Sequence, residues 1–253
     1  MEILLTNDDS HGMPFLGFLM EYLEKIASVQ VLVPAQEQSW KSKSRCSEKR
    51  LQLSSVQYCG REIYTLSGSP ADCANIGIYH LFRGKPDLVV SGLNVGRNAS
   101  LSFILSSGTV GAALEANIAG LPAVAFSQDV EDALFSYYRL NKSLPADVTG
   151  RLKEQNRQLL PRVFDWLSAQ PGFYSEPLTW SVNLPFLAGE GTQIRRCAPA
   201  HSMYLSLYDR EGDEFVRSDF QVAQDLRPGR DVSLLAQGHV VVTAIDIRRI
   251  GEA

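Results

Sequence analysis

The stretch that decides the fold is Ile3-Leu4-Leu5-Thr6-Asn7-Asp8-Asp9, an apolar run that ends in two adjacent carboxylates. A short continuous apolar run predicts a strand buried on both faces, and this one delivers both acids to the end of a sheet. Two carboxylates this close repel each other, and both stay ionised only where a cation or hydrogen-bond donors offset them. Because hard divalent cations take oxygen ligands, Asp8 and Asp9 are candidate ligands of Mg²⁺ or Mn²⁺. The alternative is that Asp8, Asp9 or Ser10 caps the helix that follows.

Outward from this stretch, the first half of the chain alternates between strand-like and helix-like segments. Strands are predicted at residues 3–6, 29–33, 63–66, 87–91 and 123–127, and helices at 15–27, 71–82 and 109–119. This alternation is typical of a parallel sheet wrapped by helices on both faces. The sequence therefore predicts an α/β core.

The second half has a different pattern. A polar, irregular stretch is expected at residues 137–150, followed by a helix at 151–169 and a strand at 180–184. Short alternating segments at 193–216 predict hairpins, and the β-branched segment at 239–247 predicts a final strand. We expect a smaller β-rich part to follow the α/β core.

Composition narrows the class of protein. The 253 residues are 45% hydrophobic and 21% charged, as in a globular domain, and no apolar stretch reaches the length of a membrane span. The formal net charge of −4 argues against a nucleic-acid backbone as partner. No leader segment is expected, because the first strand begins at residue 3. The four cysteines form no CxxC pair and have no histidine at zinc spacing, which favours free thiols in a reducing, cytoplasmic compartment.

Polar segments follow four of the predicted strands, at residues 7–9, 34–39, 67–72 and 91–98. In an open parallel sheet, ligands bind beyond the carboxyl ends of the strands, so these segments are expected to meet. Their side chains offer oxygen rather than paired Cys or His, which favours a hard cation over zinc. The amide oxygen of Asn94 is a further candidate ligand, although Ser91-Gly92-Leu93-Asn94 also fits an ordinary turn.

Two further segments suit an anion. Ser106-Ser107-Gly108-Thr109 leads into a helix, where free backbone N–H groups and the helix dipole favour a phosphate, although Ser107 or Thr109 as a simple N-cap fits equally. The basic stretch at residues 41–50 is expected to be a mobile loop. It is either a solvated surface or a flap that closes on a phosphate monoester.

Taken in order, these motifs resemble the SurE (survival protein E) family of metal-dependent nucleotidases. Beyond the opening stretch, the matching blocks are Val33-Pro34-Ala35 with Gln38-Ser39, Gly68-Ser69-Pro70-Ala71-Asp72-Cys73, Pro86-Asp87-Leu88-Val89-Val90-Ser91-Gly92-Leu93-Asn94 and Ser107-Gly108-Thr109-Val110-Gly111-Ala112-Ala113. The blocks cover residues 1–127 in the family's order, with weaker echoes at residues 182–185, at Asp231 and at residues 240–243.

The resemblance implies a Rossmann-like, mostly parallel α/β core over residues 1–135. Residues 136–253 would form a helix and a β-rich extension that serves in oligomerisation and packs in part on the core. It implies one divalent ion per subunit, Mg²⁺ or Mn²⁺, held by Asp8, Asp9, Ser39 and Asn94. The implied catalytic residues are Asn7, Asp8 and Asp9. The implied phosphate-binding residues are Ser107, Gly108 and Thr109.

The implied activity is that of a 5′-nucleotidase, a phosphomonoesterase that splits nucleoside monophosphates, and other phosphomonoesters, into alcohol and phosphate. A metal-bound water or, less readily, Asp8 would be the nucleophile. A homodimer or homotetramer is implied, with no nucleic-acid or membrane partner. The alternative is a nucleotide-binding module without turnover. A dinucleotide-dependent oxidoreductase is disfavoured, because residues 7–12 lack GxGxxG and two carboxylates there would repel a pyrophosphate.

The chain departs from the family pattern at three places. Ser10 and Trp40 stand where the family usually has glycine, and residues 98–106 are one residue longer and lack the usual acidic and tyrosine residues. All four implied metal ligands are intact. We therefore expect these changes to alter substrate preference or oligomer contacts, and metal binding to persist.

Overall fold

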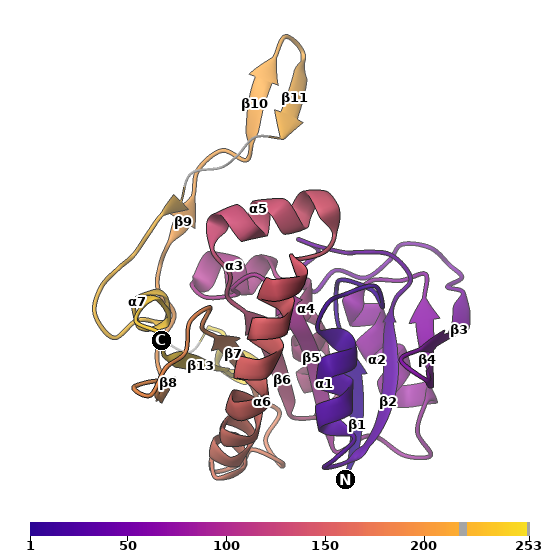
Figure 1. The fold of residues 1–253 in the computed structure, drawn as a ribbon. Helices are drawn as coiled ribbons and strands as arrows, with labels where there is room; N and C mark the ends of the chain where they lie inside the picture. The colour runs from indigo at the N-terminus through magenta and orange to yellow at the C-terminus, as the bar shows by residue number, and fades with distance from the viewer. Residues whose placement is uncertain (218–221, 252–253) are drawn as a thin grey trace.

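The computed structural model describes residues 1–217 and 222–251. Within them, helices flank one large sheet, and two small sheets lie outside it (Figure 1). The strands are β1 (Glu2–Thr6), β2 (Ser28–Pro34), β3 (Leu53–Tyr58), β4 (Arg61–Leu66), β5 (Leu88–Val95), β6 (Ala123–Gln128), β7 (Thr179–Leu184), β8 (Ile194–Arg196), β9 (Met203–Tyr204), β10 (Tyr208–Glu211), β11 (Glu214–Arg217), β12 (Val222–Ala223) and β13 (Val240–Ile245). The helices are α1 (Leu16–Leu23), α2 (Pro70–His80), α3 (Leu101–Ser106), α4 (Gly108–Ile118), α5 (Asp132–Asn141), α6 (Ala146–Ser168), α7 (Asp231–Ala236) and the 3₁₀ turn η1 (Ile247–Arg249).

The large sheet has the strand order β3-β4-β2-β1-β5-β6-β7-β13-β8 among the described residues. From β4 to β7 every neighbouring pair is parallel, whereas β3 against β4 and β13 against β7 are antiparallel. The prediction of a mostly parallel α/β core is therefore confirmed. Strands from the second half of the chain extend the same sheet.

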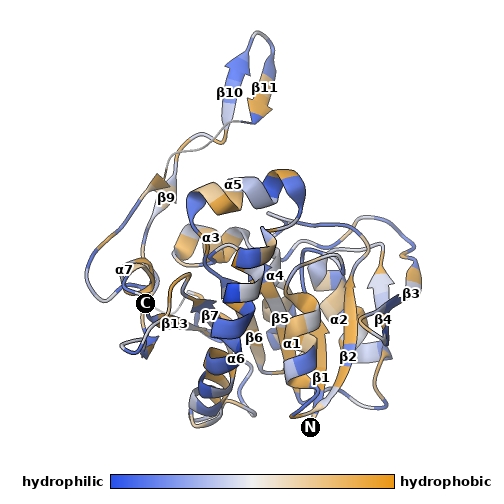
Figure 2. Cartoon of the chain, viewed as in Figure 1, coloured by the Kyte–Doolittle hydropathy of each residue, from blue (hydrophilic) through white to orange (hydrophobic). Residues whose placement is uncertain are grey.

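Alternation along β1 explains why the sheet is covered on both faces. Ile3 and Leu5 belong to the core cluster that contains α1 and α6, whereas Leu4 belongs to the cluster that contains α2 and α4. Successive side chains of a strand point to opposite faces, so a continuous apolar run needs a cover on each. Figure 2 shows the result, with hydrophobic residues along β1, β2 and α1 and a hydrophilic outer face on α6.

Several predicted elements differ from those observed. The stretch at residues 137–150, expected to be irregular, contains the end of α5 and the start of α6. Tyr138, within this stretch, is buried in the core and continues an apolar stripe of α5 that begins with Leu134 and Phe135, which pack against the core. Asp132 in the first turn and Arg139 in the last turn of α5 also suit the helix dipole.

Two further expectations were wrong in detail. The segment Ser91–Asn94, for which a turn was one alternative, is part of β5, and Asn94 pairs with Ser127 of β6 after a shift of register. Of the predicted hairpins at 193–216, β8 instead pairs in parallel with β13, and β9 pairs with β12. The β10–β11 hairpin does form, and it projects away from the body of the molecule (Figure 1).

Candidate active site

The polar segments that follow β1, β2 and β5 meet at one edge of the sheet, as the parallel pairing requires. Asp8, Asp9, Ser39 and Asn94 all line a single cavity of about 570 Å³. These are the four residues expected to hold a divalent cation. Backbone contacts hold two of the loops together, since the N–H of Gln38 donates to the carbonyl of Asp8 at 2.7 Å.

Residues at the start of α4 pack against Asp8 and fix the position of its carboxylate. The Thr109 hydroxyl, which is fully buried, donates to Asp8 Oδ1 at 2.6 Å. Gly108 lies so close that a β-carbon there would stand 2.8 Å from Asp8 Cβ and 2.9 Å from its Oδ2. The glycine is therefore needed for the close approach of helix and carboxylate.

Burial sets the electrostatics of the pair. Desolvation raises the pKa of Asp8 to about 6, against the opposing hydrogen bonds from Thr109. Desolvation raises the pKa of Asp9 well above its usual value, and the charges of Asp8 and Glu37 raise it further. Asp9 Oδ2 is buried without a hydrogen-bond partner in the described structure, and so is Asn7 Oδ1. A buried oxygen left in this state is costly, so Asp9, which lines the cavity, fits a cation ligand.

The nature of the donors indicates which cation fits. Among the described residues there is no cluster of three or more His, Cys, Asp or Glu side chains arranged to hold a metal. The set at the cavity instead has two carboxylates, one hydroxyl and one amide. Magnesium is typically bound through one or two carboxylates, with other oxygens completing its shell, and this set suits such a hard ion.

Ser39 and Asn94 each donate a hydrogen bond to another residue of the cavity lining. Ser39 Oγ donates to Glu37 Oε1 at 2.7 Å, and Asn94 Nδ2 donates to the carbonyl of Gly96 at 2.8 Å. In each case the lone pairs of the side-chain oxygen are left for another partner. Asn7 takes a different place: it does not line the cavity, and its Nδ2 donates to the carbonyl of Ser10 at 2.7 Å.

Of the three residues expected to bind phosphate, only Ser107 lines the cavity. Its Oγ also caps α4 by accepting from the N–H of Val110 at 3.1 Å. Gly108 and Thr109 lie beneath Asp8 and are not part of the lining. Both proposed roles of Ser107, the N-cap and the phosphate contact, are thus compatible with its position.

The positive charge of the cavity comes from residues that sequence reasoning missed. Arg97, Arg139, Lys142 and Arg217 line it, and Lys142 forms an ion pair with Glu37. Two of these cations lie at the end of α5, the helix whose apolar stripe was overlooked. The signal available in the sequence was the helical spacing of that stripe.

The basic loop at residues 41–50, by contrast, is fastened to the body of the protein. Lys43 forms an ion pair with the buried Glu115, and Arg45 lies 3.9 Å from the carboxylate of Asp72. No basic side chain of this loop lines the cavity described above. These contacts do not support the interpretation of this loop as a flap that closes on a phosphate monoester.

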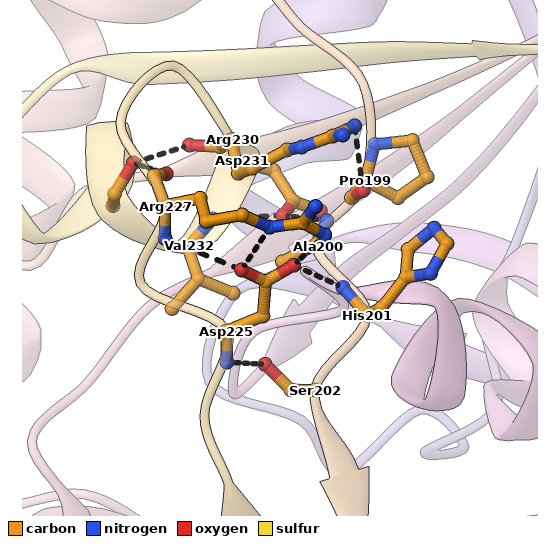
Figure 3. A network of polar contacts seen from close by, with 10 residues as sticks. Pro199, Ala200, His201, Ser202, Asp225, Arg227, Arg230, Asp231 and Val232 are labelled. Carbon is orange, nitrogen blue, oxygen red and sulfur yellow. Dashed lines mark hydrogen bonds and ion pairs between the residues drawn. The ribbon is translucent and has the colours of Figure 1, made fainter.

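A polar network joins the segments that flank β9, β12 and α7 (Figure 3). Asp225 accepts from the guanidinium of Arg227 and from the N–H of His201, and the hydrogen bonds with Arg227 hold its pKa below the usual range. The buried Asp231 accepts from the N–H groups of Ala200, at 2.7 Å, and Ser100, at 2.6 Å. Asp231 thereby ties α7 to the segment that leads into α3.

The model of the family described as survival protein SurE matches residues 3–205. The chain belongs to the SurE family. Among SurE relatives, the protein named 5′-nucleotidase SurE from Methanopyrus kandleri is 33% identical over 250 residues, which cover 97% of this chain and 91% of that protein. The 5′-nucleotidase SurE of Methanoculleus marisnigri is 34% identical over 249 residues, with the same two shares of 97% and 91%. The crystal structure of the SurE protein from Aquifex aeolicus superposes with a TM-score of 0.70 at 25% identity, covering 98% of this chain and 94% of that one. The resemblance inferred from the sequence is confirmed.

Proposed function

We propose that this SurE-family chain is a metal-dependent 5′-nucleotidase, which hydrolyses nucleoside monophosphates to a nucleoside and phosphate. The nucleotidase class rests on the family and on relatives that are themselves named 5′-nucleotidase SurE. The observation that carries the site is the meeting of Asp8, Asp9, Ser39 and Asn94 at one cavity. Nothing among the described residues favours the alternative of a nucleotide-binding module without turnover.

In this proposal Asp8, Asp9, Ser39 and Asn94 hold one Mg²⁺ or Mn²⁺ ion. When bound, such an ion supplies charge that polarises phosphoryl oxygens and acidifies a water. The buried Asp9 offers an oxygen without a hydrogen-bond partner, and Asp8 is kept in place by Thr109. These two carboxylates, with Asn7 behind them, are the proposed catalytic residues.

The substrate phosphate would lie against Ser107 at the start of α4, with Gly108 and Thr109 forming the base of that site. Arg139 lines the same cavity and would offset the phosphate's negative charge. Arg97 and Lys142 contribute less, because Arg97 lies 3.6 Å from Asp129 and 3.7 Å from Asp132, and Lys142 is paired with Glu37. In the overall reaction, water adds to phosphorus, the ester P–O bond breaks, and the nucleoside leaves as an alcohol after taking up a proton.

The test uses the full chain with AMP as substrate and inorganic phosphate as the measured product. We expect release of phosphate with Mn²⁺ or Mg²⁺ present, loss of release in EDTA, and recovery when the ion is added back. Asp8→Asn is expected to lose activity at every metal concentration. Phosphate release that EDTA leaves unchanged would refute the metal role.

The assembly is also part of the proposal. We infer a homodimer or homotetramer, with residues 136–253 as the extension that serves in oligomerisation and residues 1–135 as the core. The β10–β11 hairpin supports this, because Phe215 and Val216 on it are 67% and 44% exposed. Light scattering of the full chain and of Phe215→Ser tests it, and a monomer in both would refute it.

We also propose that the protein is located in the cytoplasm. No helix among the described residues is long and apolar enough to cross a membrane. All four cysteines are free in the structure, which supports a reducing compartment such as the cytoplasm.

A further inference from the structure

The lining of the cavity combines two kinds of side chain. It includes the carboxylates of Asp8 and Asp9 and also the rings of Trp40, Phe103 and Phe135. A phosphate group alone needs only the polar residues. A volume of about 570 Å³ lies within the range of sites that hold a whole small molecule, so the cavity has room for an aromatic part of a substrate as well.

Trp40 is held by rings from separate segments of the chain. Its ring centroid lies 5.7 Å from that of Tyr204 on β9 and 6.3 Å from that of Phe103 on α3, with interplanar angles of 72° and 66°. Phe103 and Tyr204 also contact each other, at 6.2 Å between centroids. Edge-to-face packing of this kind fixes the orientation of an indole.

The backbone places this indole next to one of the polar residues that line the cavity. Trp40 directly follows Ser39, one of the four proposed cation ligands, so their α-carbons are about 3.8 Å apart. Trp40 has a φ of 62°, in the left-handed region that most side chains avoid. The chain therefore carries a large aromatic residue at a strained position next to the proposed reaction centre, where such strain is a reason to look for a role.

We propose that Trp40 is a stacking platform for the base of the nucleotide and makes this enzyme prefer phosphomonoesters that carry a flat aromatic base. The inference rests on the proposed function and deepens it by naming what selects the substrate. Bases stack on aromatic side chains with little dependence on their identity, so the preference is for a base as such rather than for one base.

Arg217 supports the role of the indole as a platform. Its guanidinium lies 5.5 Å from the centroid of the Trp40 ring, and its side chain also lines the cavity. A guanidinium is planar, as a base is, and it already lies against this ring. The contact of an exposed cation with a ring is weak, so a base can replace Arg217 on the indole or stack beside it.

The experiment compares AMP with ribose 5-phosphate, which keeps the sugar and the phosphate and lacks the base. The readout is the ratio of kcat/KM for AMP to kcat/KM for ribose 5-phosphate. Trp40→Gly removes the platform and suits the left-handed backbone, and Trp40→Phe keeps a ring. The matched control is Tyr137→Ala, which removes a ring that is 43% exposed on α5 and does not line the cavity.

We expect the ratio to fall at least about fivefold in Trp40→Gly, from the usual strength of base–aromatic stacking, and to fall less in Trp40→Phe. Tyr137→Ala should leave the ratio unchanged. Equal losses for AMP and ribose 5-phosphate in Trp40→Gly would overturn the proposal, because they would mean that Trp40 only supports the loop. The ratio would also stay unchanged if neither substrate were affected, and that result would overturn the proposal as well.

A binding measurement separates this inference from the proposed function. Adenosine, which has no phosphate, is titrated while tryptophan emission is followed, and Trp40→Phe shows how much of any change comes from Trp40 rather than from Trp166 and Trp180. Quenching that is lost in Trp40→Phe supports the platform, even if the wild type hydrolyses neither phosphate ester. No quenching in the wild type overturns the platform, even if AMP is hydrolysed.

Discussion

Replacing Thr109 by valine tests how the protein keeps Asp8 ionised. The Thr109 hydroxyl donates to Asp8 Oδ1 at 2.6 Å, and valine has nearly the same shape without the donor. A hydrogen bond to a charged group contributes about 1.5–3 kcal/mol, and 1.36 kcal/mol corresponds to about one pKa unit. Because the pKa of Asp8 is already raised to about 6, the variant should have a pKa of about 7 to 8 there.

This shift predicts a pH-dependent loss of metal affinity, because a carboxylate must be deprotonated to bind a cation. At pH 6.5 roughly three quarters of wild-type Asp8 is ionised, against a quarter or less in Thr109→Val. Affinity for Mn²⁺ should therefore fall about 3- to 25-fold at pH 6.5. At pH 8.5 both proteins are largely ionised, and the difference should shrink to less than about twofold.

The assay is calorimetric titration with Mn²⁺ at both pH values, without substrate. Thr109→Ser, which keeps the hydroxyl, is the matched control and should bind nearly as the wild type does. An equal loss of affinity at pH 6.5 and pH 8.5 would show that Thr109 positions the site without affecting ionisation. Unchanged affinity at pH 6.5 would refute the reasoning altogether.

Three other predictions follow from the same contacts. In EDTA the raised pKa of Asp8 makes the folded state hold a proton that the unfolded state loses. This stabilisation is full below the unfolded pKa of 3.8 and is lost as pH rises through about 6, so urea unfolding at pH 4 and pH 7.5 should show a drop larger by about 2 kcal/mol in the wild type than in Asp8→Asn. Gly111→Ala should lower the urea midpoint of unfolding, because a β-carbon there would stand 2.1 Å from the carbonyl oxygen of Ser42. Alanine has the better helix propensity, so a raised midpoint would show that the predicted clash does not occur. Asp231→Ala should destabilise the protein by about 2–4 kcal/mol, since the N–H groups of Ser100 and Ala200 lose a buried carboxylate acceptor, and a change below about 0.5 kcal/mol in thermal unfolding would refute this anchor.

The core of the fold could be predicted because its signals are local. The apolar run of β1 needs a cover on both faces, and each strand–helix alternation of the first half is a parallel unit. The convergence of Asp8, Ser39 and Asn94 followed from the same logic, since parallel strands end at one edge. No side-chain contact had to be known to expect this.

The cations of the cavity could not be predicted in that way. Arg139 and Lys142 reach the site only because α5 packs its stripe of Phe135 and Tyr138 over the sheet edge, which is a tertiary fact. The basic loop at 41–50 had the more visible charge, yet one of its lysines, Lys43, is paired with the buried Glu115. A charge run shows how much charge is present, and the packing of distant elements decides where it acts.

Ser10 and Trp40 show what a family pattern can and cannot transfer. The family pattern leads us to expect glycine at both places, and here both residues have a left-handed backbone, with φ of 68° and 62°. For residues other than glycine this conformation costs roughly 1–2 kcal/mol each, which explains why glycine suits both positions. The new side chains differ in what they reach: the Ser10 hydroxyl donates to a neighbouring carbonyl, whereas the indole of Trp40 enters the wall of the cavity. A glycine in the family pattern thus fits the left-handed backbone of this chain, and the side chain that stands there instead sets what the loop presents to a substrate.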